Sequence, residues 1–128
     1  MKKEINTETV FINGVEYAPI DKLNSIPKQN TEGLPYVCIR TYSAGVHFGY
    51  LKSKTSTLAG MEVVLLDSQR MRYWEGAMDL SVLSTEGSAN PEKCKPSVIL
   101  PYIELVAIEI IPVSETAFKN IKSMPIWK

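Results

Sequence analysis

The fold is decided by the stretch YVCIRTYSAGVHFGYL, which occupies residues 36–51. Alternation in its first half puts Val37, Ile39 and Thr41 on a face that packs in the core. The other face is expected to present aromatic rings and a cation outward, and it carries Tyr36, Cys38, Arg40 and Tyr42. The small residues at 43–45 can turn the chain back into a second strand. The stretch therefore predicts two neighbouring antiparallel strands.

Further strands extend this sheet along the chain. The second strand is predicted over residues 46–51 and, after a polar loop at 52–60, the third over 61–66. Residues 97–100 predict a short strand. Residues 104–111 predict a long strand that is apolar on nearly both faces, which requires cover from two sides.

Two helices complete the predicted domain. After Asp67 the apolar period changes to about 3.6 residues, which predicts a main helix that starts within residues 67–77 and ends at Gly87. Ser114 is expected to cap a short C-terminal helix that Pro125 ends. The sequence thus predicts an α+β fold, with an antiparallel β-sheet, one main helix and a short C-terminal helix.

The first 35 residues differ from the rest. Asn13-Gly14 lies between two β-prone runs in residues 9–17, which predicts a β-hairpin. Residues 21–35 are polar and rich in turn formers, as in a mobile connection. We therefore expect an N-terminal hairpin extension and linker over residues 1–35, followed by a ligand-binding α+β domain over residues 36–128.

Charge and composition narrow the function. The 128 residues include 14 Lys and Arg and 14 Asp and Glu, so no net field favours DNA, RNA or a membrane surface. No apolar run approaches the roughly 20 residues of a membrane span, and the N-terminus has no secretory pattern. The expected location is cytoplasmic.

Cys38 and Cys94 are too far apart in the sequence for a zinc-binding or redox pair, and both are expected to be reduced thiols.

Catalytic chemistry has little support in this sequence. His47 is the only histidine, which excludes a site that needs two histidine ligands. A cysteine paired with His47 as a nucleophile stays open as an alternative. We therefore predict no catalytic residue, no metal site and no cofactor, and a protein that is not an enzyme.

The residues most informative about function are the arginines and aromatics near Arg70. Arg70, Arg72 and Trp74 are predicted at the start of a helix. The positive end of the helix dipole disfavours guanidinium groups there, so a nearby anion is expected to compensate. Two guanidinium groups and an indole suit a phosphate joined to a flat base. The alternative is that the arginines pair with Asp67 and Glu75 on the surface while the indole anchors the core.

Two stretches, IRTYSAGVHFG at 39–49 and RMRYWEGA at 70–77 with Leu80-Ser81 following, resemble the phage Thoeris anti-defence family. The resemblance runs from Tyr36 to Trp127 and leaves residues 1–35 unmatched. It implies a sponge protein that binds cyclic ADP-ribose isomers, made by bacterial immune TIR-domain enzymes, without cleaving them. It also implies a homo-oligomer, with a hexamer favoured, acting in the infected host, and in some members cyclic trinucleotides at separate sites.

The candidate ligand-binding residues come from chemistry placed on these stretches. Arg70 and Arg72 are the candidates for binding phosphate, and Trp74 and Tyr42 are the candidates for stacking on the base. The polar rim of the site is assigned to Arg40, Ser43 and Asn90. For two of them a structural role is an equal alternative, Arg40 as an ion-pair partner and Asn90 as a turn residue. Two other functions remain open, a nucleotide hydrolase or phosphodiesterase that degrades the same signal, and a ligand-free oligomeric adaptor domain.

Overall fold

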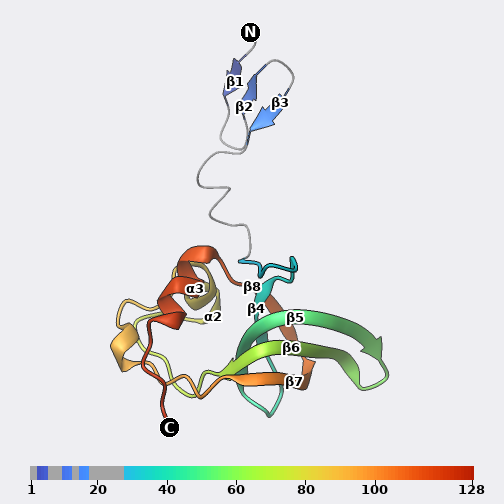
Figure 1. Cartoon of the computed structure of the whole chain (residues 1–128), viewed down its shortest axis with the longest axis vertical. Coiled ribbons are helices and arrows are strands. Elements are labelled where there is room, and N and C mark those ends of the chain that lie inside the picture. The colour runs from blue at the N-terminus through green and yellow to red at the C-terminus, as the bar shows by residue number, and fades with distance from the viewer. Residues whose placement is uncertain (1–2, 6–9, 13–14, 18–27) are drawn as a thin grey trace.

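The structure, a computed structural model, describes residues 3–5, 10–12, 15–17 and 28–128, the first three segments by their backbone only. Five antiparallel strands form its larger sheet: β4 (Tyr36–Arg40), β5 (Val46–Thr57), β6 (Gly60–Arg70), β7 (Leu100–Ala107) and β8 (Glu109–Pro112). Beside it lie the helices α2 (Leu80–Thr85) and α3 (Glu115–Lys122) and the 3₁₀ helix η1 (Pro91–Lys93) (Figure 1). The predicted α+β fold with an antiparallel sheet is confirmed.

The sheet is strongly curled. Its strand order is β7-β6-β5-β4-β8, so β7 and β8 are its two edges, yet Ile108 alone separates them along the chain. The Ile108 amide donates to the Arg40 carbonyl over 2.8 Å. The single strand predicted over residues 104–111 is therefore wrong, because the chain bends at Ile108 and passes from one edge to the other. The short strand predicted at 97–100 is also wrong except for Leu100, which begins β7.

Strand β4 is buried on both faces. Val37 and Ile39 pack with β6 and β7 inside the curled sheet, as the alternation predicts. Tyr36 and Cys38 were expected on an outward face, and this is wrong. They pack instead with residues of α2 and α3 in a second core, which we name the helix-side core, because the two helices lie against that side of the sheet (Figure 1).

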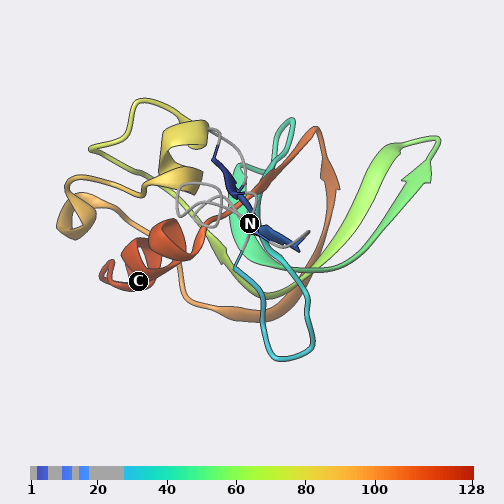
Figure 2. The same cartoon turned by 90° about the horizontal axis from the view of Figure 1, so that it is seen from above.

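The hairpin of β5 and β6 is longer than predicted. Residues 52–60 were expected to form a loop, but β5 continues to Thr57 and pairs with β6 at Gly60. Figure 2 shows this hairpin projecting from the side of the sheet opposite the helices. The side chains of residues 52–57 are polar and mostly exposed, so this part of β5 lacks the hydrophobic alternation that marks a half-buried strand, although its backbone pairs with β6.

The helix predicted from residues 67–77 starts later. Residues 70–72 are extended, with the Met71 amide donating to the Val46 carbonyl at 2.8 Å and the Arg72 amide to the Lys95 carbonyl at 3.1 Å. Helix α2 begins at Leu80, after Asp79 accepts from an amide of its first turn. The predicted end is confirmed, since Gly87 follows α2 with a φ of 83° that glycine adopts readily.

The C-terminal helix agrees with its prediction. The Ser114 hydroxyl accepts from the Ala117 amide at 3.0 Å, and α3 ends before Pro125. No helix among the described residues is long and apolar enough to cross a membrane.

The N-terminal residues form a small sheet of their own. Strands β2 (Val10–Ile12) and β3 (Val15–Tyr17) pair as the predicted hairpin, and β1 (Lys3–Ile5) adds a third strand that was not predicted. The predicted turn, Asn13-Gly14, lies outside the described residues, as do residues 21–27 of the predicted connection. The described end of that connection is bonded to the main body, where the Lys28 amide donates to the Val113 carbonyl at 2.8 Å.

Candidate functional site

A braced turn joins β4 to β5. The Thr41 hydroxyl accepts from the Ala44 amide and donates to the Gly45 carbonyl, both at 2.8 Å. Gly45 adopts a φ of 89°, which a residue with a side chain rarely adopts. Tyr42, Ser43 and Ala44 are exposed at the top of this turn. The turn therefore presents its surface in a fixed shape.

His47 supports this turn from within. Its side chain is 1% exposed, and its Nε2 atom lies 2.9 Å from the Ala44 carbonyl oxygen. Burial lowers the pKa of His47, the bond to Ala44 opposes the shift, and the Arg70 charge adds to it. At neutral pH the ring is uncharged and can donate from Nε2 to the carbonyl. His47 thus acts on the shape of the turn.

The end of β6 brings two arginines to the turn. Asp67 has a left-handed backbone, with φ of 50°, at an irregularity in the β5–β6 pairing that bends the strand. Beyond it Arg70 and Arg72 point to one side of the extended chain, and Met71 between them is buried in the helix-side core. A β-carbon added to Gly45 would lie 3.9 Å from the Arg70 Nε atom, so the two segments are adjacent.

These segments border an open hollow on the surface, which we name the turn site. Its volume is about 460 Å³, and it is lined by Ser43, Ala44, Gly45, Arg70, Met71 and Arg72. Both arginine side chains are exposed, and in the described part of the chain neither forms an ion pair. The expected alternative, pairing with Asp67 and Glu75, is not observed, since Glu75 pairs with Lys93 at 3.6 Å. The turn site therefore holds two cationic groups available to an anion.

Of the seven candidate residues, three line the turn site: Ser43, Arg70 and Arg72. Tyr42 lines the next hollow, on the other side of the same turn. The arrangement differs from the predicted helix start, because the two arginines share a side through a period of two residues in an extended chain.

The other three candidates have structural contacts elsewhere. Arg40 Nε lies 2.6 Å from a Glu109 carboxylate oxygen across the β4–β8 pair, which matches the ion-pair alternative. Trp74 packs against the helix-side core. Asn90 is half-buried before η1, where its backbone amide donates to the Ser88 hydroxyl at 2.9 Å. None of the three lines the turn site.

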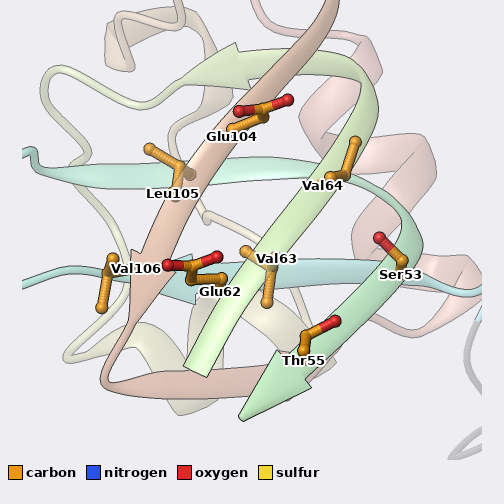
Figure 3. Close-up of a pocket in the computed structure, with 8 residues that line it drawn as sticks. All are labelled: Ser53, Thr55, Glu62, Val63, Val64, Glu104, Leu105 and Val106. Carbon is orange, nitrogen blue, oxygen red and sulfur yellow. The ribbon is translucent and has the colours of Figure 1, made fainter. Parts of the chain in front are cut away.

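A second hollow of similar size lies on the outer face of β5, β6 and β7. This outer groove has a volume of about 400 Å³ and is lined by Ser53, Thr55, Glu62, Val63, Val64, Glu104, Leu105 and Val106. Figure 3 shows the carboxylates of Glu62 and Glu104, from neighbouring strands, on the same face as the hydroxyls of Ser53 and Thr55. Two carboxylates repel a phosphate, so the outer groove is the less suitable hollow for a nucleotide.

The cysteines do not supply a nucleophile near His47. Both are free thiols, as predicted, and both are buried, Cys94 in the core on the helix side of the sheet. In the register of β4 and β5, Cys38 faces Phe48 while His47 faces Ile39, so Cys38 and His47 point to opposite faces of the sheet. Burial is the main cause that raises the pKa of the Cys38 thiol to about 12. No group of three or more potential metal ligands occurs among the described residues.

Comparison of the sequence with known proteins shows to which family the chain belongs. One family profile, described as Domain of unknown function (DUF6948), matches residues 34–121. The chain belongs to the DUF6948 family. The matched residues include every residue of the turn site and both flanking strands. No curated protein and no solved structure matches the chain.

Sequence reasoning missed several residues around the turn. Gly45 was read only as part of a turn, although its φ of 89° is what the turn requires and its backbone lies beside Arg70. Val106 and Ile108 line the hollow beside Tyr42, and were assigned to a strand interior. The alternation of Arg70, Met71 and Arg72 was the available signal for an extended segment.

Proposed function

We propose that this chain binds a phosphate-bearing nucleotide at the turn site and holds it without cleaving it. The observation that supports this most is the pair Arg70 and Arg72, which flank one hollow and have no carboxylate partner in the described structure. Guanidinium groups form strong, charge-assisted hydrogen bonds with phosphate oxygens. The hydroxyl of Ser43, on the opposite wall, adds a donor for the same anion.

The first nucleotide class to test is that of cyclic ADP-ribose isomers. The resemblance of residues 39–49 and 70–77 to the phage Thoeris anti-defence family motivates this choice, and these two segments build the turn site. In this proposal the protein is a sponge in the cytoplasm of the infected bacterium. By sequestering the immune signal it prevents activation of the effector, and cyclic trinucleotides are a second class to test.

The position of His47 supports binding over hydrolysis. The ring is buried, its Nε2 atom is bonded to the Ala44 carbonyl, and its pKa is lowered. A general base must reach the proton that it removes from a substrate or water. His47 does not line the turn site, and its one described polar contact supports the turn.

Assembly into a homo-oligomer, with a hexamer favoured, is part of the same proposal. Several apolar side chains on and before β7 are 42% to 60% exposed: Val98, Ile99, Leu100 and Tyr102. A contiguous exposed apolar surface commonly marks a protein interface. Light scattering at micromolar concentration should give an even number of subunits, and a monomer would contradict this part of the proposal.

The proposal is tested by binding and by recovery of the ligand. Arg70→Ala or Arg72→Ala should each weaken binding of a cyclic ADP-ribose isomer about tenfold or more, because each removes a charge-assisted contact worth roughly 1.5–3 kcal/mol. Calorimetry and a melting curve measure affinity and folding together. Arg40→Ala is the matched control, since this arginine is already paired with Glu109.

The bound nucleotide should also be recovered unchanged. The protein is incubated with the nucleotide, freed of unbound ligand and denatured, and the released compound is identified by mass spectrometry. Unchanged affinity in both arginine variants would exclude the turn site as the binding site. Release of a hydrolysed product would instead support the hydrolase alternative, and absence of any bound nucleotide would favour the adaptor alternative.

A further inference from the structure

The β4–β5 turn separates two hollows. On one side is the turn site with its two arginines, and on the other is a smaller hollow of about 260 Å³. We name the second the ring pocket, and its lining residues are Thr41, Tyr42, Ser43, Ala44, Ala59, Val106 and Ile108. Both hollows share Ser43 and Ala44, so a molecule bound in one is a single turn away from the other.

The chemistry of the ring pocket is opposite to that of the turn site. None of its lining residues is charged. Tyr42 is 92% exposed, and the aliphatic side chains of Val106 and Ile108 are 41% and 49% exposed. An exposed aromatic ring beside aliphatic groups offers a flat, sequence-tolerant surface on which a heterocycle stacks.

The wall between the two hollows keeps its shape. Thr41 bonds both Ala44 and Gly45, and His47 bonds the Ala44 carbonyl from below. A preorganised wall lowers the ordering cost when one ligand contacts both sides. Charge on one side and apolar surface on the other are the two recognition elements that a nucleotide requires.

We propose that the ring pocket receives the base of the nucleotide whose phosphate is held in the turn site, so that the ligand straddles residues 43 and 44. This inference rests on the proposed function and adds the base-recognition element to it. In this proposal Tyr42 is the residue that makes the protein bind nucleotides more tightly than simple phosphates. Trp74, the other predicted stacking residue, has no part in it, because its indole packs against the helix-side core.

The test compares two probes, ADP and inorganic pyrophosphate, by calorimetry. Tyr42→Ala should weaken binding of ADP about tenfold, in the range found when a stacking aromatic is removed, and leave pyrophosphate affinity unchanged. Arg72→Ala should weaken both probes. Tyr42→Phe is the matched control and should retain ADP binding, because it keeps the ring.

The outcomes separate the two proposals. If Arg72→Ala weakens both probes while Tyr42→Ala leaves ADP affinity unchanged, the ring pocket is overturned and the phosphate site stands. Equal weakening of both probes by Tyr42→Ala also overturns it, since the ring would then act on the phosphate part. If neither probe binds, or Arg72→Ala changes neither affinity, the proposed phosphate site fails and the ring pocket fails with it. Melting curves of each variant verify folding.

Discussion

The turn site and the scaffold around it use the same residue types for different purposes. Arg70 and Arg72 stand at the turn without a carboxylate partner in the described structure, whereas Arg40 is bonded to Glu109 at 2.6 Å. Tyr42 is almost fully exposed, whereas Trp74 packs against the core. An arginine or aromatic residue therefore indicates a binding site only when its neighbours leave its hydrogen-bond donors unpaired or its ring exposed.

The sharpest test of the scaffold side is Trp74→Ala. Truncating an indole packed against the core should lower the free energy of unfolding by about 3 kcal/mol, through lost burial and a residual cavity. Chemical denaturation measures this. At a temperature where the variant remains folded, its ADP affinity should equal that of the unmodified protein, and a specific loss of affinity would move Trp74 from the scaffold into the site.

The sharpest test of the turn side is a charge reversal. Arg72→Glu should reduce nucleotide affinity about a hundredfold, because it removes one contact and adds repulsion of the phosphate. Glu104→Gln in the outer groove is the matched control, since it changes charge in the other large hollow. Calorimetry on both variants decides between the hollows. If only Glu104→Gln altered affinity, the outer groove would be the binding site.

Much of the fold could be predicted from the hydrophobic periodicity and the helix-capping residues of the sequence. The alternation around Val37 and Ile39, the cap at Ser114 and the glycine stop at Gly87 each depend on local chemistry, and the structure confirms all three. The outer half of β5, residues 52–57, could not be predicted as a strand, because its side chains are polar and mostly exposed to solvent. It is held by backbone pairing with β6, which leaves no hydrophobic pattern in that part of the sequence.

The candidate site could be predicted only in part from the sequence, for a related reason. Arg70, Arg72 and Ser43 were chosen for their chemistry, and the structure brings them together. Their arrangement depends on long-range pairing of residues 70–72 with Val46 and Lys95, which overrides the helical period read from residues 67–77. The bend at Ile108 is also tertiary, since its amide bonds the Arg40 carbonyl on a distant strand.

A smaller effect should come from the histidine beneath the turn. The folded pKa of His47 is lowered from 6.5, so as the pH falls the unfolded chain gains its proton first. The stabilising contribution is therefore complete above about pH 6.5 and is lost as the pH falls through the lowered folded pKa. Urea denaturation across this range should show the decline, and His47→Gln should flatten it. An equal decline in the variant would assign it to other groups.

The smallest effect is expected at the paired arginine. Arg40 and Glu109 lie at the exposed end of the β4–β8 pair, with about half of each side chain accessible to solvent. Exposed ion pairs contribute roughly 0.2–1 kcal/mol, because water screens the attraction and ordering two long side chains has an entropic cost. Arg40→Ala should therefore lower the free energy of unfolding by less than about 1 kcal/mol, and added salt should reduce the difference. Nucleotide affinity should not change. A tenfold loss of affinity in Arg40→Ala, with folding intact, would extend the site across the turn to β8 and remove the distinction between paired and unpaired arginines.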